Sequence, residues 1–215
     1  MTYLELVNSV LVRLREEQVA TVNESDYSAM VGAFVNDAKR LVEDAWDWTA
    51  LRDTYSFDTV QGTSTYVLPG YSTRSKLISV YNTTDNAVIG LQSLEYIRQK
   101  DLGSEGAEGN IINYVIDGVD SNGDIKLRFY AVPNAIKSMI VNGVKRSGEL
   151  SNDSDESLVP YSPIIQWAYS YALRERGETG GQSGAEQAIF AQNDLATAIS
   201  LDAANHQEEL IWNYI

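Results

Sequence analysis

The spacing of apolar residues changes twice along this chain, and this change limits the folds that the chain can adopt. From Tyr27 to Ala45, apolar side chains recur at every third or fourth residue over about five turns, which predicts an amphipathic helix. From about Arg52 the period falls to two, which is typical of strands. Helical spacing returns after Ser162. We therefore expect helices at both ends of the chain and strands between them.

The N-terminal part is predicted to contain two helices. Thr2 and Glu5 have the spacing of a capping box, in which each side chain accepts a hydrogen bond from the other residue's backbone N–H. A shared apolar face follows, with Leu4, Val7, Leu11 and Leu14. Trp46 and Trp48 end the second helix, and we expect both to bury against the next layer.

The middle part, residues 52–148, is predicted to be a small antiparallel β domain with a short helix at 94–102. Asn122-Gly123 indicates the turn of a hairpin. A calcium loop centred on the same glycine would need ligands at Gly118 and Phe129, and neither residue can supply one. The turn is therefore the better interpretation.

The C-terminal part is predicted to contain two more helices. The acidic stretch 148–157, GELSNDSDES, is typical of an exposed linker. Ser162-Pro163 indicates the start of a third helix, because proline fits the first turn. Ser183 and Glu186 have the spacing of a second capping box and indicate a fourth helix rich in small residues.

These patterns predict an α+β fold class. Helices from the two ends form a four-helix bundle, because no single helix can bury its apolar face alone. A small antiparallel β domain is inserted between them. The expected parts are an N-terminal helical pair at 1–51, the β domain at 52–148, and C-terminal helices with a docking tail at 149–215.

The formal charge of −14 and the absence of cysteine limit the possible functions. An acidic surface repels the phosphate backbone, so sequence-specific nucleic-acid binding is not expected. The charge can serve solubility alone, or it can line a passage through which nucleic acid slides. The start MTYLELVNSV does not resemble a signal peptide, and no apolar run is long enough for a membrane span. We expect a soluble protein made in a cytoplasm.

No catalytic or metal-binding motif is found. His206 is the only histidine, and we expect it to be an exposed residue of the last helix. The glycine-rich stretch 177–184 is not followed by the Lys-Ser or Lys-Thr of a phosphate-binding loop, so it is better explained as a linker. We therefore predict no enzyme activity, no cofactor and no metal.

Four stretches resemble the head-to-tail adaptor proteins of tailed phages, and among these the tail tubular protein A type. They are MTYLELVNSVLVRLRE and FVNDAKRLVEDAWDW near the start, and YSPIIQWAYSYALRERGETGG and SLDAANHQEELIWNY near the end. The resemblance implies a virion protein at the head-tail junction. It implies a ring of identical subunits, usually twelve, between the portal protein and a tail nozzle or tube protein. DNA would pass through the ring non-specifically, and no catalytic residues are implied.

Two segments are candidate docking sites. The C-terminus is unusually apolar for a chain end, and we expect it either to fold back on its own bundle or to dock on the portal or a neighbouring subunit, with Trp212 as anchor. The segment 103–109 is too glycine-rich for regular structure, and we expect a loop that faces the next tail component. The candidate residues are Leu210, Ile211, Trp212, Tyr214 and Ile215 in the tail, and Gly103, Ser104, Glu105, Gly106 and Gly109 in the loop.

Two other functions are compatible with the sequence. A tail-associated binding module of a phage particle would have exposed aromatic residues on the β domain and would not form a ring. A carboxylate-dependent hydrolase would need two close carboxylates in a cleft, one with a raised pKa.

Overall fold

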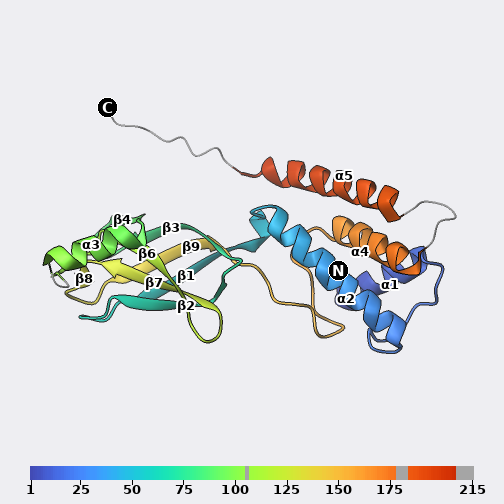
Figure 1. Cartoon of the computed structure of the whole chain (residues 1–215), viewed down its shortest axis with the longest axis horizontal. Helices are drawn as coiled ribbons and strands as arrows, with labels where there is room; N and C mark the ends of the chain where they lie inside the picture. Colours follow the sequence, from blue (N-terminus) through green and yellow to red (C-terminus); the bar gives the residue numbers. More distant parts are fainter. Residues whose placement is uncertain (105–106, 178–183, 207–215) are drawn as a thin grey trace. The chain divides into compact units, whose positions relative to one another are not determined.

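The computed structural model describes residues 1–104, 107–177 and 184–206. The chain divides into two compact units (Figure 1). A helical unit contains Met1–Leu51 and Ser147–Ile215, and a β unit contains Arg52–Arg146. Within the described residues, no helix has the length and apolar character needed to cross a membrane.

Three helices of the helical unit share one core. They are α1 (Tyr3–Arg13), α2 (Asp26–Ala45) and α4 (Tyr161–Arg176). Their fully buried side chains include Leu6, Val10, Val35, Val42, Ile164 and Ala168. The predicted capping box of Thr2 and Glu5 is confirmed, and it fixes the start of α1. α4 begins at Tyr161, slightly earlier than predicted, with Pro160 as its N-cap residue.

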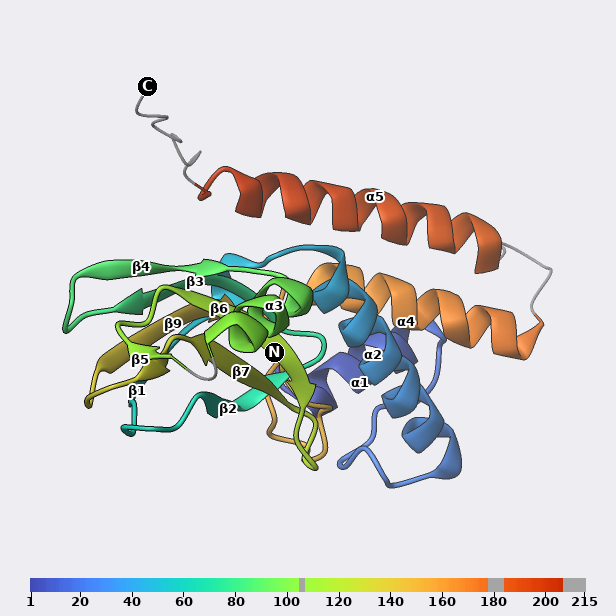
Figure 2. The same cartoon turned by 60° about the vertical axis from the view of Figure 1, so that its left-hand side comes forward.

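The fourth long helix, α5 (Gly184–Ala203), does not complete a four-helix bundle. It runs alongside α4 in both views (Figures 1 and 2) and buries only three side chains, Gln187, Ala191 and Leu195. Its larger apolar side chains point outward: Ile189 is 60% exposed, Phe190 53% and Leu201 70%. The apolar residues of α5 are spread around its circumference, so the helix has no single face that a shared core could bury.

The β unit is larger and more complex than the predicted insertion. Seven strands form one sheet in the order β1-β9-β3-β4-β6-β7-β2. Their bounds are Arg52–Asp58 (β1), Thr65–Ser72 (β2), Lys76–Asn82 (β3), Ala87–Leu91 (β4), Asn113–Val119 (β6), Asp124–Tyr130 (β7) and Ser138–Val144 (β9). A second sheet pairs β5 (Glu108–Gly109) with β8 (Val132–Pro133). The predicted fold class, a four-helix bundle with a small antiparallel β domain, is therefore wrong.

The large sheet is mixed because a helix separates two of its neighbouring strands. The predicted short helix is present as α3 (Leu94–Ser104), and it carries the chain from β4 to β6, which pair in parallel. The sheet also curves nearly into a barrel. Phe57 of β1 and Tyr66 of β2, on the two edge strands, have ring centroids 5.2 Å apart. The Asn122-Gly123 turn is confirmed between the antiparallel strands β6 and β7.

The acidic segment predicted to be an exposed linker is bound to the helical unit. The Leu150 backbone N–H donates to Asn36 Oδ1 at 2.9 Å, and Asn36 Nδ2 donates back to the Leu150 carbonyl at 3.0 Å. Near the start of α1, the Tyr3 N–H donates to the Asp155 carbonyl at 2.8 Å. The backbone of this segment therefore makes hydrogen bonds to α1 and α2.

The predicted irregular segment 103–109 is partly regular. Gly103 and Ser104 end α3, and Gly109 lies in β5, whereas Glu105 and Gly106 lie outside the described residues. Ser183 of the second predicted capping box also lies outside them.

Candidate functional site

The two units differ sharply in charge. The β unit has ten Lys and Arg residues and ten Asp and Glu residues. The helical unit has the other six of the sixteen basic residues and the other twenty of the thirty acidic residues, so it carries the whole formal charge of −14. A strongly acidic surface lowers the local affinity for phosphate backbones.

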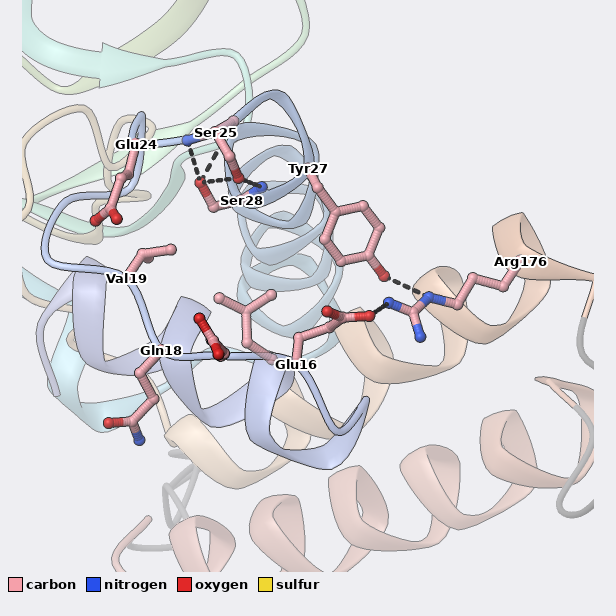
Figure 3. A pocket seen from close by; sticks show the side chains of 10 residues that line it. Glu16, Gln18, Val19, Glu24, Ser25, Tyr27, Ser28 and Arg176 are labelled. Atoms are coloured by element: carbon pink, nitrogen blue, oxygen red, sulfur yellow. Dashed lines mark hydrogen bonds and ion pairs between the residues drawn. The ribbon is translucent and has the colours of Figure 1, made fainter.

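Arg176, in the last turn of α4, joins three parts of the helical unit (Figure 3). Its Nε donates to the Tyr27 hydroxyl at 2.6 Å, one Nη donates to Glu16, and the other donates to the Leu14 carbonyl at 3.4 Å. The guanidinium also lies over the Tyr27 ring, with 4.8 Å between its carbon and the ring centroid. The planar fork of arginine suits such a set of acceptors.

Arg176, Tyr27 and Glu16 line a hollow of about 530 Å³, together with Glu17, Gln18 and Glu24. Burial raises the pKa of the Tyr27 phenol, and the hydrogen bond and charge of Arg176 oppose this effect. Glu16 is paired with Arg176, and Glu24 accepts a hydrogen bond from the Ala20 N–H at 2.6 Å. This arrangement stabilises the connection between α1 and α2.

A second hollow, of about 560 Å³, lies between α2 and α4. Phe34 and Tyr171 form its half-buried aromatic floor, with ring centroids 6.2 Å apart in an edge-to-face arrangement. Asp37, Arg174 and Glu175 are exposed at its rim. Burial raises the pKa of the Tyr171 phenol; Asp37 raises it further, and Arg174 opposes both. An aromatic floor with a charged rim is typical of a surface that binds another protein segment.

Asp202, in the last turn of α5, fixes this end of the helix to the end of α2. Its Oδ2 accepts hydrogen bonds from Trp46 Nε1 at 3.0 Å and from the Thr49 N–H at 3.0 Å, and it lies 3.1 Å from His206 Nε2. Burial opposes ionisation of Asp202. The hydrogen bonds from Thr49, His206 and Trp46 outweigh this effect and lower its pKa.

His206 is therefore not the exposed residue that we expected. It follows the end of α5, and its ring centroid lies 5.3 Å from that of Trp46. Trp48 is buried as predicted, and its Nε1 donates to the Val42 carbonyl at 2.7 Å. The chain thus enters its C-terminal segment from a fixed point beside the end of α2.

The predicted docking residues are only partly placed by the structure. Leu210, Ile211, Trp212, Tyr214 and Ile215 lie outside the described residues. In the predicted loop, Ser104 ends a helix and Gly109 pairs with Pro133. Of the candidate residues that the structure describes, Gly103 and Ser104 therefore lie in α3 and Gly109 lies in β5.

Sequence reasoning missed the Asp202 cluster, the role of Arg176 and the α2–α4 hollow. Phe34 and Tyr171 were visible only as apolar residues of helix faces. Their pairing depends on how the helices pack, which residue spacing does not determine.

The shifted carboxyl groups do not resemble those of a hydrolase. The hydrogen bond from Lys137 lowers the pKa of Asp85, and the backbone N–H groups of Asn152 and Ser151 lower that of Asp155. A general acid would need a shift in the opposite direction. Among the described residues, no group of three or more His, Cys, Asp or Glu side chains could hold a metal ion.

Comparison with known proteins identifies the family. The family described as SU10 adaptor protein matches residues 1–209, almost the whole chain. No curated protein matches the chain. Phage adaptors interact with other head or tail proteins of the virion, and theirs is a family of structural proteins rather than enzymes. The chain therefore belongs to the SU10 adaptor protein family, a family of phage adaptors.

Proposed function

We propose that this adaptor is one subunit of a closed ring at the head-tail junction of a virion. The ring would lie between the portal protein and a tail nozzle or tube protein, and twelve copies would form it, as the resemblance implies. DNA would pass through the central hole without sequence-specific contacts. The family match supports the adaptor role, and the charge of the helical unit supports the passage of DNA.

The observation that carries the proposal is the unequal division of charge between the two units. The helical unit has a formal charge of −14, and the β unit is neutral. A bore lined by the helical unit would bind DNA weakly, so DNA could slide through it. The β unit would then be available for contacts with head or tail proteins.

The outward face of α5 supports a contact between identical subunits. Ile189, Phe190 and Leu201 are exposed on a helix that is otherwise rich in alanine. Exposed apolar residues of this kind commonly mark interaction surfaces. A ring needs heterologous contacts, in which one surface of a subunit meets a different surface of the next. We propose that α5 provides one of these two surfaces.

Two further contacts are part of the proposal. The apolar tail, with Trp212 as its anchor, docks on the portal or on a neighbouring subunit once the ring is assembled. The segment 103–109 faces the next tail component. Deletion of residues 207–215 should then abolish attachment to the portal and leave the subunit folded.

Mass photometry of the full chain, with and without the portal of the same phage, tests the proposal. The expected result is a small species alone and a complex with portal whose added mass equals a whole ring. A chain that stays compact and ignores the portal would favour the tail-associated binding module instead.

A further inference from the structure

The hollow between α2 and α4 has no assigned occupant, although its floor is aromatic. Phe34 and Tyr171 form the floor, and Arg174 lies at the rim. We propose that the C-terminal segment of the same chain, residues 207–215, occupies this hollow in the free subunit, with Trp212 on the aromatic floor. This inference rests on the proposed function, because it describes where the docking tail lies before assembly.

The position of the chain at His206 brings the hollow within reach. His206 contacts Trp46, immediately after the end of α2. Phe34 lies twelve residues before Trp46, which is about 18 Å along a helix. Trp212 lies six residues after His206, and six extended residues span at most about 22 Å. The indole can therefore reach the floor of the hollow without a second copy of the chain.

The direction of the segment also matches the charges at the rim. A segment that runs from Trp46 toward Phe34 passes Asp37 first and then reaches the end of α4, where Arg174 lies one turn beyond Tyr171. With Trp212 on the floor, the Tyr214 ring would arrive beside the Arg174 guanidinium. An arginine stacks well on an aromatic ring, and the contact would fix the register of the segment.

The chemistry of the segment suits the floor as well as the rim. Residues 210–215 read LIWNYI, so five of the last six side chains are apolar or aromatic. A tryptophan against a Phe–Tyr pair is the kind of contact that dominates the energy of small interfaces. In the free subunit the segment would therefore be held in place, and a partner would have to displace it.

Disulfide trapping tests the proposal directly, because the full chain contains no cysteine. A double variant, Asp37→Cys with Ile211→Cys, should form an intramolecular disulfide in the monomer under mild oxidation, because residue 211 precedes Trp212 on the side of Asp37. A control, Asp26→Cys with Ile211→Cys, places the first cysteine on the same helix about 16 Å farther along. It should form at least tenfold less disulfide, because a bridge needs Cα atoms less than about 7 Å apart.

The rim contact is tested in the same background. Arg174→Glu should lower the rate of disulfide formation severalfold, whereas Arg13→Glu, an exposed arginine in the last turn of α1, should leave it unchanged. A disulfide only between chains, or equal yields at positions 37 and 26, would overturn the proposal. Ring formation on the portal without the intramolecular disulfide would overturn this inference alone. The disulfide in the double variant, together with no ring from the unmodified chain on the portal, would overturn the proposed function and leave the occupied hollow standing.

Discussion

Lys39 and Glu43 form a buried ion pair whose disruption should strongly destabilise the helical unit. Lys39 Nζ lies 2.8 Å from Glu43 Oε1, and the side chains are 3% and 0% exposed. Nζ also donates to Ser147 and, at 2.7 Å, to the Gly148 carbonyl. Lys39→Met removes the cation and leaves the carboxylate in the core. Breaking a buried pair from one side costs about 3–5 kcal/mol.

Urea unfolding followed by tryptophan fluorescence measures this cost in the correct unit. All four tryptophans lie in the helical unit, so the signal does not report the β unit. With a slope of about 2 kcal/mol per molar urea, the midpoint should fall by roughly 2 M. The double variant Lys39→Met/Glu43→Leu should recover most of this loss, because it leaves no unpaired charge.

The neighbouring pair of Arg40 and Glu149 provides a matched control. It joins the same two segments, but its side chains are 52% and 64% exposed. Arg40→Met should therefore cost less than about 1 kcal/mol. The reasoning is refuted if Lys39→Met costs no more than Arg40→Met, or if the double variant is as unstable as Lys39→Met alone.

Three further predictions follow from the packing. Because folding lowers the pKa of Asp202 from its ordinary value of 3.8, the ionised carboxylate stabilises the helical unit at pH values above 3.8, and this stabilisation should be lost as the pH falls through the lower pKa of the folded state. Tryptophan fluorescence between about pH 5 and 2 should show this loss in the unmodified chain, and the Asp202→Asn variant should lack it. Gly143→Ala should destabilise the β unit by about 1–3 kcal/mol, because an added Cβ would lie 2.7 Å from a backbone oxygen. The control Gly103→Ala, in open space within α3, should be neutral or stabilising, and unfolding followed by far-ultraviolet circular dichroism measures both variants. Arg176→Lys should lower the free energy of unfolding of the helical unit by about 1–2 kcal/mol, since the compact ammonium of lysine does not reproduce the planar fork with which arginine reaches all three acceptors. An unchanged midpoint in tryptophan fluorescence would show that the three hydrogen bonds do not stabilise the unit.

Local signals in the sequence predicted individual elements well. The Thr2–Glu5 capping box and the long periodicity of residues 27–45 each correspond to a helix in the structure. The period of two that begins at about Arg52 coincides with the start of β1, and the Asn122-Gly123 turn joins two strands as predicted. These features depend on neighbouring residues, so the sequence contains the required information.

The assembly of these elements was not predictable in the same way. The apolar residues of α5 occur all around the helix, so its spacing could not show that only one narrow side would be buried. The parallel pairing of β4 and β6 depends on the path of α3, and the approach of Phe57 to Tyr66 depends on the curvature of the sheet. Such contacts join residues that are far apart in the chain.

The same limit applies to the candidate sites. The charge of −14 was evident from composition, but its confinement to one unit became visible only when the structure defined the two units. The interactions of Arg176 with residues of α2 and the α1–α2 connection likewise required the packed helices. The apolar tail was recognisable from sequence, but the hollow that we propose for it depends on how α2 and α4 pack.

Electron microscopy of the chain assembled on its portal would show whether these adaptor subunits form a ring around a passage for DNA. We expect a closed ring with a continuous bore, with the acidic helical unit at the wall of the bore. A ring whose inner wall is lined by Lys and Arg, or a chain that binds the portal without closing a ring, would contradict it.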